Sequence, residues 1–137
     1  MIYIVIFISG SIVGSFLNVC IHRLPRGESV AFPASHCPGC LRPIPWYMNI
    51  PMASYLMLRG RCAYCKAKIS FRYFIVEALT AAMFVLIYRK FGMSPELAVY
   101  SALFSVLIVV SFIDIEHWII PDELVIPGTV IGLLLSV

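Results

Sequence analysis

Four cysteines in two close pairs are the residues of this chain best suited to bind a metal ion. Cys37 pairs with Cys40 and Cys62 pairs with Cys65, and residues 41–61 separate the two C-x2-C motifs. Two such motifs at this separation are typical of a four-thiolate zinc ribbon, whose tetrahedral ion has no open position for chemistry. The spacing therefore predicts a structural Zn²⁺ site formed by all four cysteines.

The same cysteines are also compatible with two disulfide bonds or with a redox-active pair. Eight of the ten Lys and Arg residues lie between Arg23 and Arg72, and that segment holds one acid, Glu28. Basic loops of membrane proteins stay on the cytoplasmic side, where lasting disulfides are uncommon. The charge pattern therefore favours zinc over disulfides. His36, next to Cys37, could compete as a ligand, although a histidine beside such a motif is more often simply exposed.

Four acids within ten residues follow an apolar segment directly: Asp114, Glu116, Asp122 and Glu123. A carboxylate at the bilayer boundary is costly to ionise and usually faces a cavity in which it has a function. Because Asp114 ends the apolar segment, we expect it to be buried, in the kind of environment that acid–base catalysis on water requires. For the other three acids the simpler interpretation is a solvated connecting loop, and for His117 a surface histidine rather than a base or ligand.

Aspartic proteolysis needs a second carboxyl group, close enough to the first to share a proton. Asp122 is a candidate by spacing, although Pro121 argues against one continuous helix between it and Asp114. Glu77 is a second candidate, near the start of another apolar segment. The simpler interpretations of Glu77 are a pair with Arg72 or contact with lipid headgroups.

The elements that must position these residues are apolar segments. Of the 137 residues 61% are hydrophobic and 12% charged, with a mean hydropathy of +0.96, which excludes a soluble globular domain. Residues 1–21 contain no charge or histidine and are long enough to span a bilayer. Residues 73–88 and 97–113 are shorter predicted spans, completed by flanking residues. The residues after Glu123 are too few to span, so we expect the natural protein to continue.

We therefore predict an all-α integral membrane protein with about four transmembrane helices, the last incomplete, and a cysteine-rich cytoplasmic insert like a zinc ribbon. The predicted parts are residues 1–21 (first transmembrane helix), 22–72 (basic four-cysteine loop domain) and 73–137 (start of a second membrane domain). Gly10 and Gly14 form a G-x-x-x-G pair that permits close helix packing. For the basic loop, contact with lipid headgroups is a better interpretation than nucleic-acid binding, and no nucleic-acid partner is expected.

A series of short motifs in a fixed order covers essentially the whole chain and resembles the type IV prepilin peptidases. The motifs are Gly14-Ser15-Phe16-Leu17-Asn18-Val19, Arg23-Leu24-Pro25, Ser35 before the first cysteine pair, Asn49-Ile50-Pro51, Leu58-Arg59-Gly60-Arg61-Cys62, Ile69-Ser70 with Tyr73, Val76-Glu77, and Asp114 through Pro121-Asp122.

The resemblance implies a multi-pass aspartic endopeptidase of the bacterial inner membrane, which removes the basic leader from type IV prepilins or pseudopilins at the cytoplasmic face. Asp114 matches the family's first catalytic aspartate. The second belongs to a G-x-G-D motif that this sequence lacks, so we expect the chain alone to be inactive. Residues 73–137 would be the start of the intramembrane peptidase domain.

Many members of this family also methylate the new amino terminus from S-adenosylmethionine, a function associated with the cytoplasmic cysteine region. The partners implied are the prepilin substrates and membrane lipid. The alternative is a non-catalytic, membrane-anchored zinc-binding interaction module.

Overall fold

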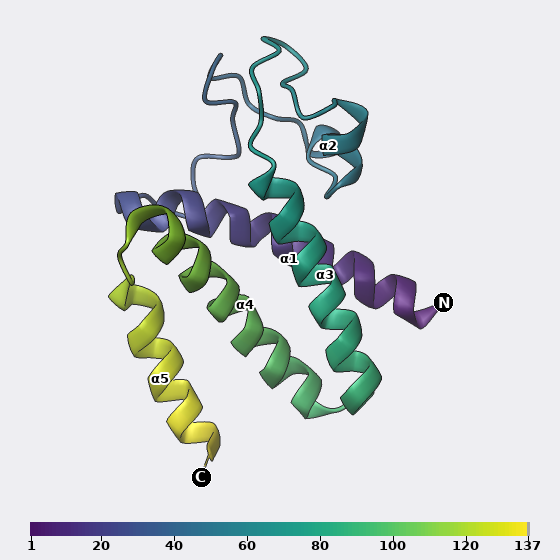
Figure 1. Cartoon of the computed structure of the whole chain (residues 1–137), viewed down its shortest axis with the longest axis vertical. Helices are drawn as coiled ribbons and strands as arrows, with labels where there is room; N and C mark the ends of the chain where they lie inside the picture. Colours follow the sequence, from purple (N-terminus) through teal and green to yellow (C-terminus); the bar gives the residue numbers. More distant parts are fainter. Residues whose placement is uncertain (137) are drawn as a thin grey trace.

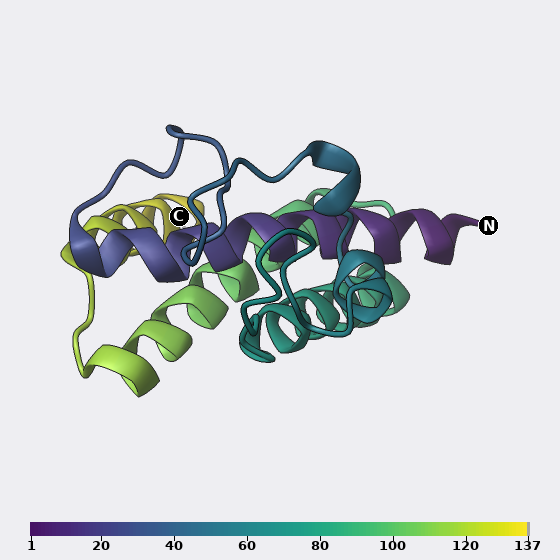
Figure 2. The same cartoon turned by 90° about the horizontal axis from the view of Figure 1, so that it is seen from above.

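The computed structural model describes residues 1–136, and the chain is helical throughout these residues apart from connecting segments (Figure 1). The elements are α1 (Ile2–Arg23), η1 (Leu24–Arg26), η2 (Trp46–Met48), α2 (Ala53–Met57), α3 (Arg72–Phe91), α4 (Pro95–His117) and α5 (Asp122–Ser136). The long helix α1 crosses α3 and α4, and the segment between α1 and α3 forms a separate layer above them (Figures 1 and 2).

Two helical stretches are long and apolar enough to cross a membrane: Ile2–Arg26 and Pro95–His117, each with a mean hydropathy of 2.2. They coincide with the first and third predicted spans, and the all-helical class is confirmed. The second predicted span and the last apolar segment form helices α3 and α5. Within residues 1–136 these two helices do not meet the same criterion of length and composition. The total of about four spans stays a prediction.

The closest helix contact is between α1 and α3, and two glycines make it possible. A Cβ atom added at Gly10 would lie 2.7 Å from the Cα of Ala81, and one at Gly14 would lie 2.7 Å from the Cα of Glu77. Real Cβ atoms essentially never lie within 3.0 Å of another residue's atoms, so neither position could carry a larger side chain without a shift of the helices. The close packing predicted from the G-x-x-x-G pair is therefore confirmed.

The apolar core lies where α1, α3 and α4 meet. Ile21, Val76 and Ile113 contribute one fully buried side chain from each helix. Asn18 is buried beside them, and its Nδ2 donates a hydrogen bond to the Tyr73 carbonyl at 3.0 Å. This core joins the end of α1, the start of α3 and the end of α4. It therefore brings two segments to the same end of the helices: the cysteine segment (residues 24–71) and the acidic segment (residues 114–123).

Replacing Gly14 by leucine is expected to force α1 and α3 apart. Overpacking of this kind lowers the free energy of unfolding by about 1–3 kcal/mol. Gly132→Leu is the matched control, because nothing in the described part of the chain lies within 4 Å of a Cβ at that position on α5. Thermal unfolding in detergent measures the difference, and equal midpoints for the two variants would contradict the glycine-dependent contact.

Candidate functional site

The four cysteines of the two C-x2-C motifs converge on one point. Their Sγ atoms all lie within 4.8 Å of one another, and those of Cys37 and Cys65 are 3.6 Å apart. Four thiolates about 2.3 Å from one zinc ion would have sulfurs about 3.8 Å apart, so this donor set fits a tetrahedral site. All five cysteines of the chain are free. His36 does not belong to the cluster, so the cysteines alone could hold a metal ion.

Both C-x2-C turns have the same backbone structure. In each, the N–H of the first cysteine donates to the carbonyl five residues later, and its carbonyl accepts from the N–H four residues later. The residue after the second cysteine has a positive φ, 58° at Leu41 and 59° at Lys66. The two turns are therefore formed locally and then placed face to face.

Hydrogen bonds within the cluster give two of its thiols different acidities. Backbone N–H groups of Cys65 and Tyr64 donate to Cys62 and lower its pKa to about 6. The Ala67 N–H lowers the pKa of Cys65, but burial and the neighbouring thiols, Cys37 first, outweigh it and raise the pKa to about 11. Of these two cysteines, Cys62 therefore ionises first. Metal binding to the cluster would release protons from the others.

Gly39 lies at the contact between the two turns. A Cβ there would lie 3.1 Å from the Cβ of Ala67 and 3.3 Å from Cys65 Sγ. We expect Gly39→Val to push the turns apart and weaken zinc binding about 10- to 100-fold, the range for residues that orient metal ligands. Leu41→Gly is the control, because glycine readily adopts the positive φ of that position. Chelator competition measures both affinities, and equal values would contradict this role for Gly39.

Asp114 lies in the last turn of α4. Its carbonyl accepts a hydrogen bond from the Trp118 N–H at 2.9 Å, and the helix ends there. A break that includes Pro121 separates it from Asp122, the first residue of α5, as the proline predicted. The expectation that Asp114 is buried is wrong for the described chain, in which it is exposed. Ile113 faces the core instead, and adjacent positions of a helix do not share a face.

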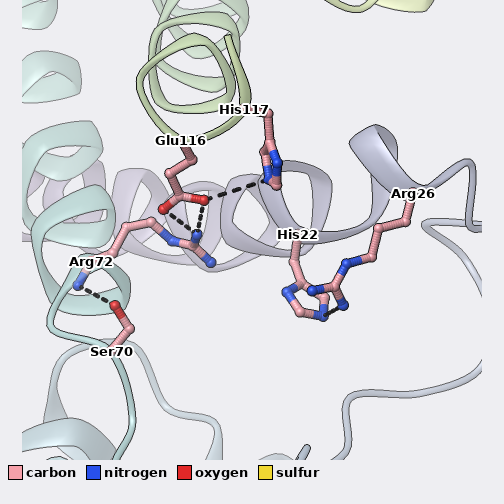
Figure 3. Close-up of polar contacts among 6 residues, drawn as sticks. All are labelled: His22, Arg26, Ser70, Arg72, Glu116 and His117. Atoms are coloured by element: carbon pink, nitrogen blue, oxygen red, sulfur yellow. Dashed lines mark hydrogen bonds and ion pairs between the residues drawn. The ribbon is translucent and has the colours of Figure 1, made fainter. Parts of the chain in front are cut away.

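Two other acids have partners that the sequence did not predict. Glu77 is 7% exposed and accepts a hydrogen bond from the Met52 N–H at 2.7 Å, so it binds the residue before α2 rather than Arg72 or headgroups. Arg72 binds Glu116: its Nη1 lies 2.5 Å from Oε1 and 2.6 Å from Oε2 (Figure 3). Glu116 is therefore not simply a solvated loop acid. No local pattern signals contacts between residues so far apart in sequence.

In the described part of the chain, the structure brings together the four predicted metal ligands, whereas no hydrogen bond joins Asp114 to another carboxylate. Within residues 1–136, the side chain of Asp114 has no hydrogen bond or ion pair. His117 lies 3.9 Å from Glu116, measured from Nε2 to Oε2 (Figure 3). The Arg72–Glu116 contact joins the acidic segment to the first residue of α3, which directly follows the cysteine segment.

Known proteins are similar to this chain over both the cysteine segment and the acidic segment. The chain is 44% identical to a prepilin leader peptidase/N-methyltransferase of Myxococcus xanthus (strain DK1622) over 96% of its length. It is 40% identical to one of Klebsiella pneumoniae over 96% and 38% identical to one of Neisseria gonorrhoeae over 93%. These matches cover 39%, 60% and 53% of the relatives' own lengths. No solved structure matches the chain.

A family model provides a second comparison. The model for the bacterial peptidase A24 N-terminal domain matches residues 8–91, which include most of α1, the whole cysteine segment and α3. The two apolar helices and these relatives agree in indicating a membrane protein. The chain belongs to the bacterial peptidase A24 N-terminal domain family.

Proposed function

We propose that this chain is part of an aspartic endopeptidase of the bacterial inner membrane that removes the basic leader of type IV prepilins or pseudopilins on the cytoplasmic side. One observation carries the proposal: the similarity to relatives named prepilin leader peptidase/N-methyltransferase extends over 96% of the chain. A match of that extent includes both the four cysteines and Asp114.

Asp114 is assigned as one of the two catalytic carboxyl groups. In an aspartic mechanism one carboxyl activates water while the other donates a proton to the scissile carbonyl. Asp114 lies in the last turn of the apolar helix α4, at the depth where the leader of a membrane-bound prepilin would emerge. Its exposed side chain leaves room for a second carboxylate from another segment, which the family resemblance assigns to a G-x-G-D motif absent from this sequence.

The prepilin would be held by its apolar helix, packed in the bilayer beside the helices of the enzyme. This arrangement fixes the scissile bond at one depth, and such positioning contributes a large part of the rate. Asp122, the first residue of α5, is an exposed acid that is suited to attract the basic leader toward Asp114.

The four-cysteine cluster is assigned as a structural Zn²⁺ site. Residues 24–71 contain only the two short helical turns and the five-residue α2, so a bound metal would stabilise a segment with little regular structure of its own. S-adenosylmethionine would supply the methyl group for N-methylation of the new amino terminus.

The direct test incubates the full-length protein from the natural gene, in detergent or lipid discs, with a purified prepilin. We expect release of the leader by cleavage of a single peptide bond, and addition of one methyl group when S-adenosylmethionine is present. Mass spectrometry of the mature product detects both. An intact prepilin would contradict the proposal and favour the non-catalytic zinc-binding membrane module.

A further inference from the structure

The ion pair between Arg72 and Glu116 joins two parts of the molecule that are far apart in sequence. Arg72 is the first residue of α3, directly after the cysteine segment. Its backbone N–H donates a hydrogen bond to Ser70 Oγ at 3.3 Å. Glu116 is in the last turn of α4. One guanidinium nitrogen contacts both carboxylate oxygens, at 2.5 and 2.6 Å (Figure 3). The contact therefore links the start of one helix to the end of the next.

The charges of this pair oppose the helix dipoles. The N-terminus of a helix favours acidic side chains and the C-terminus favours basic ones. Arg72 places a cation at the start of α3, and Glu116 places an anion at the end of α4. Each residue is thus unfavourable for its own helix and favourable only with its partner. Residues that conflict with a local preference in this way often have a functional reason.

The pair also fixes the rotation of the turn that carries Asp114. Val109, Ile113 and Glu116 follow the spacing of one helix face, and the first two are buried against the neighbouring helices. Asp114 precedes Glu116 by two positions, about 200° around the helix axis, and so points away from that face. Holding Glu116 against α3 therefore sets the direction in which Asp114 points.

Within residues 1–136, no other side chain of this last turn forms a polar contact with another helix. The remaining ion pair of the turn is local, between Glu116 and His117. The last carbonyls of a helix lack partners in the helix, and helix ends fray readily. Without the Arg72 contact, this end of α4 would be held against its neighbours by apolar packing, to which Phe112 and Ile113 contribute.

We propose that the Arg72–Glu116 ion pair is a positioning contact that orients Asp114 for peptide-bond cleavage and connects it to the cysteine segment. The inference rests on the proposed peptidase function. Neither residue is assigned contact with the substrate. Partly exposed ion pairs contribute little to stability, and the two side chains are 15% and 34% exposed. The effect is therefore expected in the catalytic rate rather than in folding.

The test uses the full-length protein and the prepilin cleavage assay. We expect Glu116→Gln and Arg72→Gln each to lower kcat about 10- to 100-fold, the cost of a small misplacement of a catalytic group. KM should stay within about twofold and the zinc content unchanged, because substrate binding and the metal site are not altered. Glu116→Asp, which keeps the charge, should give an intermediate rate.

A charge swap separates the pair from its individual members. Arg72→Glu combined with Glu116→Arg restores an ion pair and also agrees with both helix dipoles. We expect the swapped protein to recover at least about tenfold in kcat over either single reversal, a coupling that only interacting residues show. If each single reversal lowers kcat and the swapped protein does not recover it, the inference is overturned.

Two further variants separate this inference from the proposed function. Glu123→Gln removes one nearby negative charge at the start of α5 and should leave kcat unchanged. Asp114→Asn should be inactive. If Asp114→Asn is inactive while Glu116→Gln and Arg72→Gln cleave at the normal rate, the positioning role is wrong and the peptidase assignment stands. If Asp114→Asn cleaves normally, the assignment of Asp114 itself fails.

Discussion

Asp114→Asn in the full-length protein is expected to lower the rate of prepilin cleavage by about 10²- to 10⁴-fold, the usual contribution of a general acid–base group. An asparagine side chain has nearly the same shape as aspartate but cannot take a proton from water. The prepilin should still bind, because its apolar helix and basic leader do not depend on one carboxylate. The expected result is therefore a lower kcat with a nearly unchanged KM, measured by leader release over time.

The matched control for this prediction is Glu123→Gln, which makes the same change of carboxylate to amide at the exposed start of α5. It should cleave at the normal rate. Normal cleavage by the Asp114→Asn protein would contradict the aspartic assignment, whatever the control shows. A loss of zinc or a lower thermal midpoint in Asp114→Asn would mean that the variant is misfolded, so both are measured alongside the rate.

Cys62→Ser is expected to reduce the zinc content from about one ion per chain to near zero. Serine is a poor zinc ligand, and structural zinc contributes about 10–16 kcal/mol of apparent binding free energy in small four-ligand sites. Cys62 Sγ lies within 4.8 Å of the other three sulfurs, so its loss leaves only three ligands. The cysteine segment should then unfold, which limited proteolysis detects as new cleavage between α1 and α3.

The control is Cys20→Ala, which removes the one cysteine that lies outside the cluster, in the buried part of α1. This variant should keep a full complement of zinc. Absence of zinc from the unaltered protein, prepared under reducing conditions with the segment still resistant to protease, would contradict the metal site.

The local features of this molecule could be predicted from its sequence. Each C-x2-C turn is formed by hydrogen bonds among residues at most five apart, so the motif itself contains the information for its structure. The same holds for Gly10 and Gly14, whose spacing places both on one helix face. Pro121 likewise marks the break between α4 and α5.

The contacts between distant residues could not be predicted in the same way. Glu77 and Met52 are 25 positions apart and Arg72 and Glu116 are 44 apart. The Arg72–Glu116 pair forms where the core of α1, α3 and α4 brings the start of α3 to the end of α4. The Glu77–Met52 contact forms where the residue before α2 meets α3. Helix-end preferences would even have argued against an arginine at the start of α3 and a glutamate at the end of α4.

The predicted burial of Asp114 was wrong for a related reason. Burial of a side chain depends on every segment that packs on it, and a position directly after an apolar run carries no information about those segments. Only the face of α4 that contains Ile113 is covered in the described chain. The sequence indicated that an acid follows the apolar run, but not which segments surround it.

The face-to-face arrangement of the two cysteine turns determines where the chain can accept inserted residues. The turns bring Cys40 and Cys62 together, so the ends of residues 41–61 are fixed close to each other. Such a segment is a closed loop, and each doubling of a loop's length costs only about 0.6 kcal/mol of closure entropy. Insertions between the two motifs are therefore tolerated far more readily than insertions within either motif, where each residue has a fixed place in the turn.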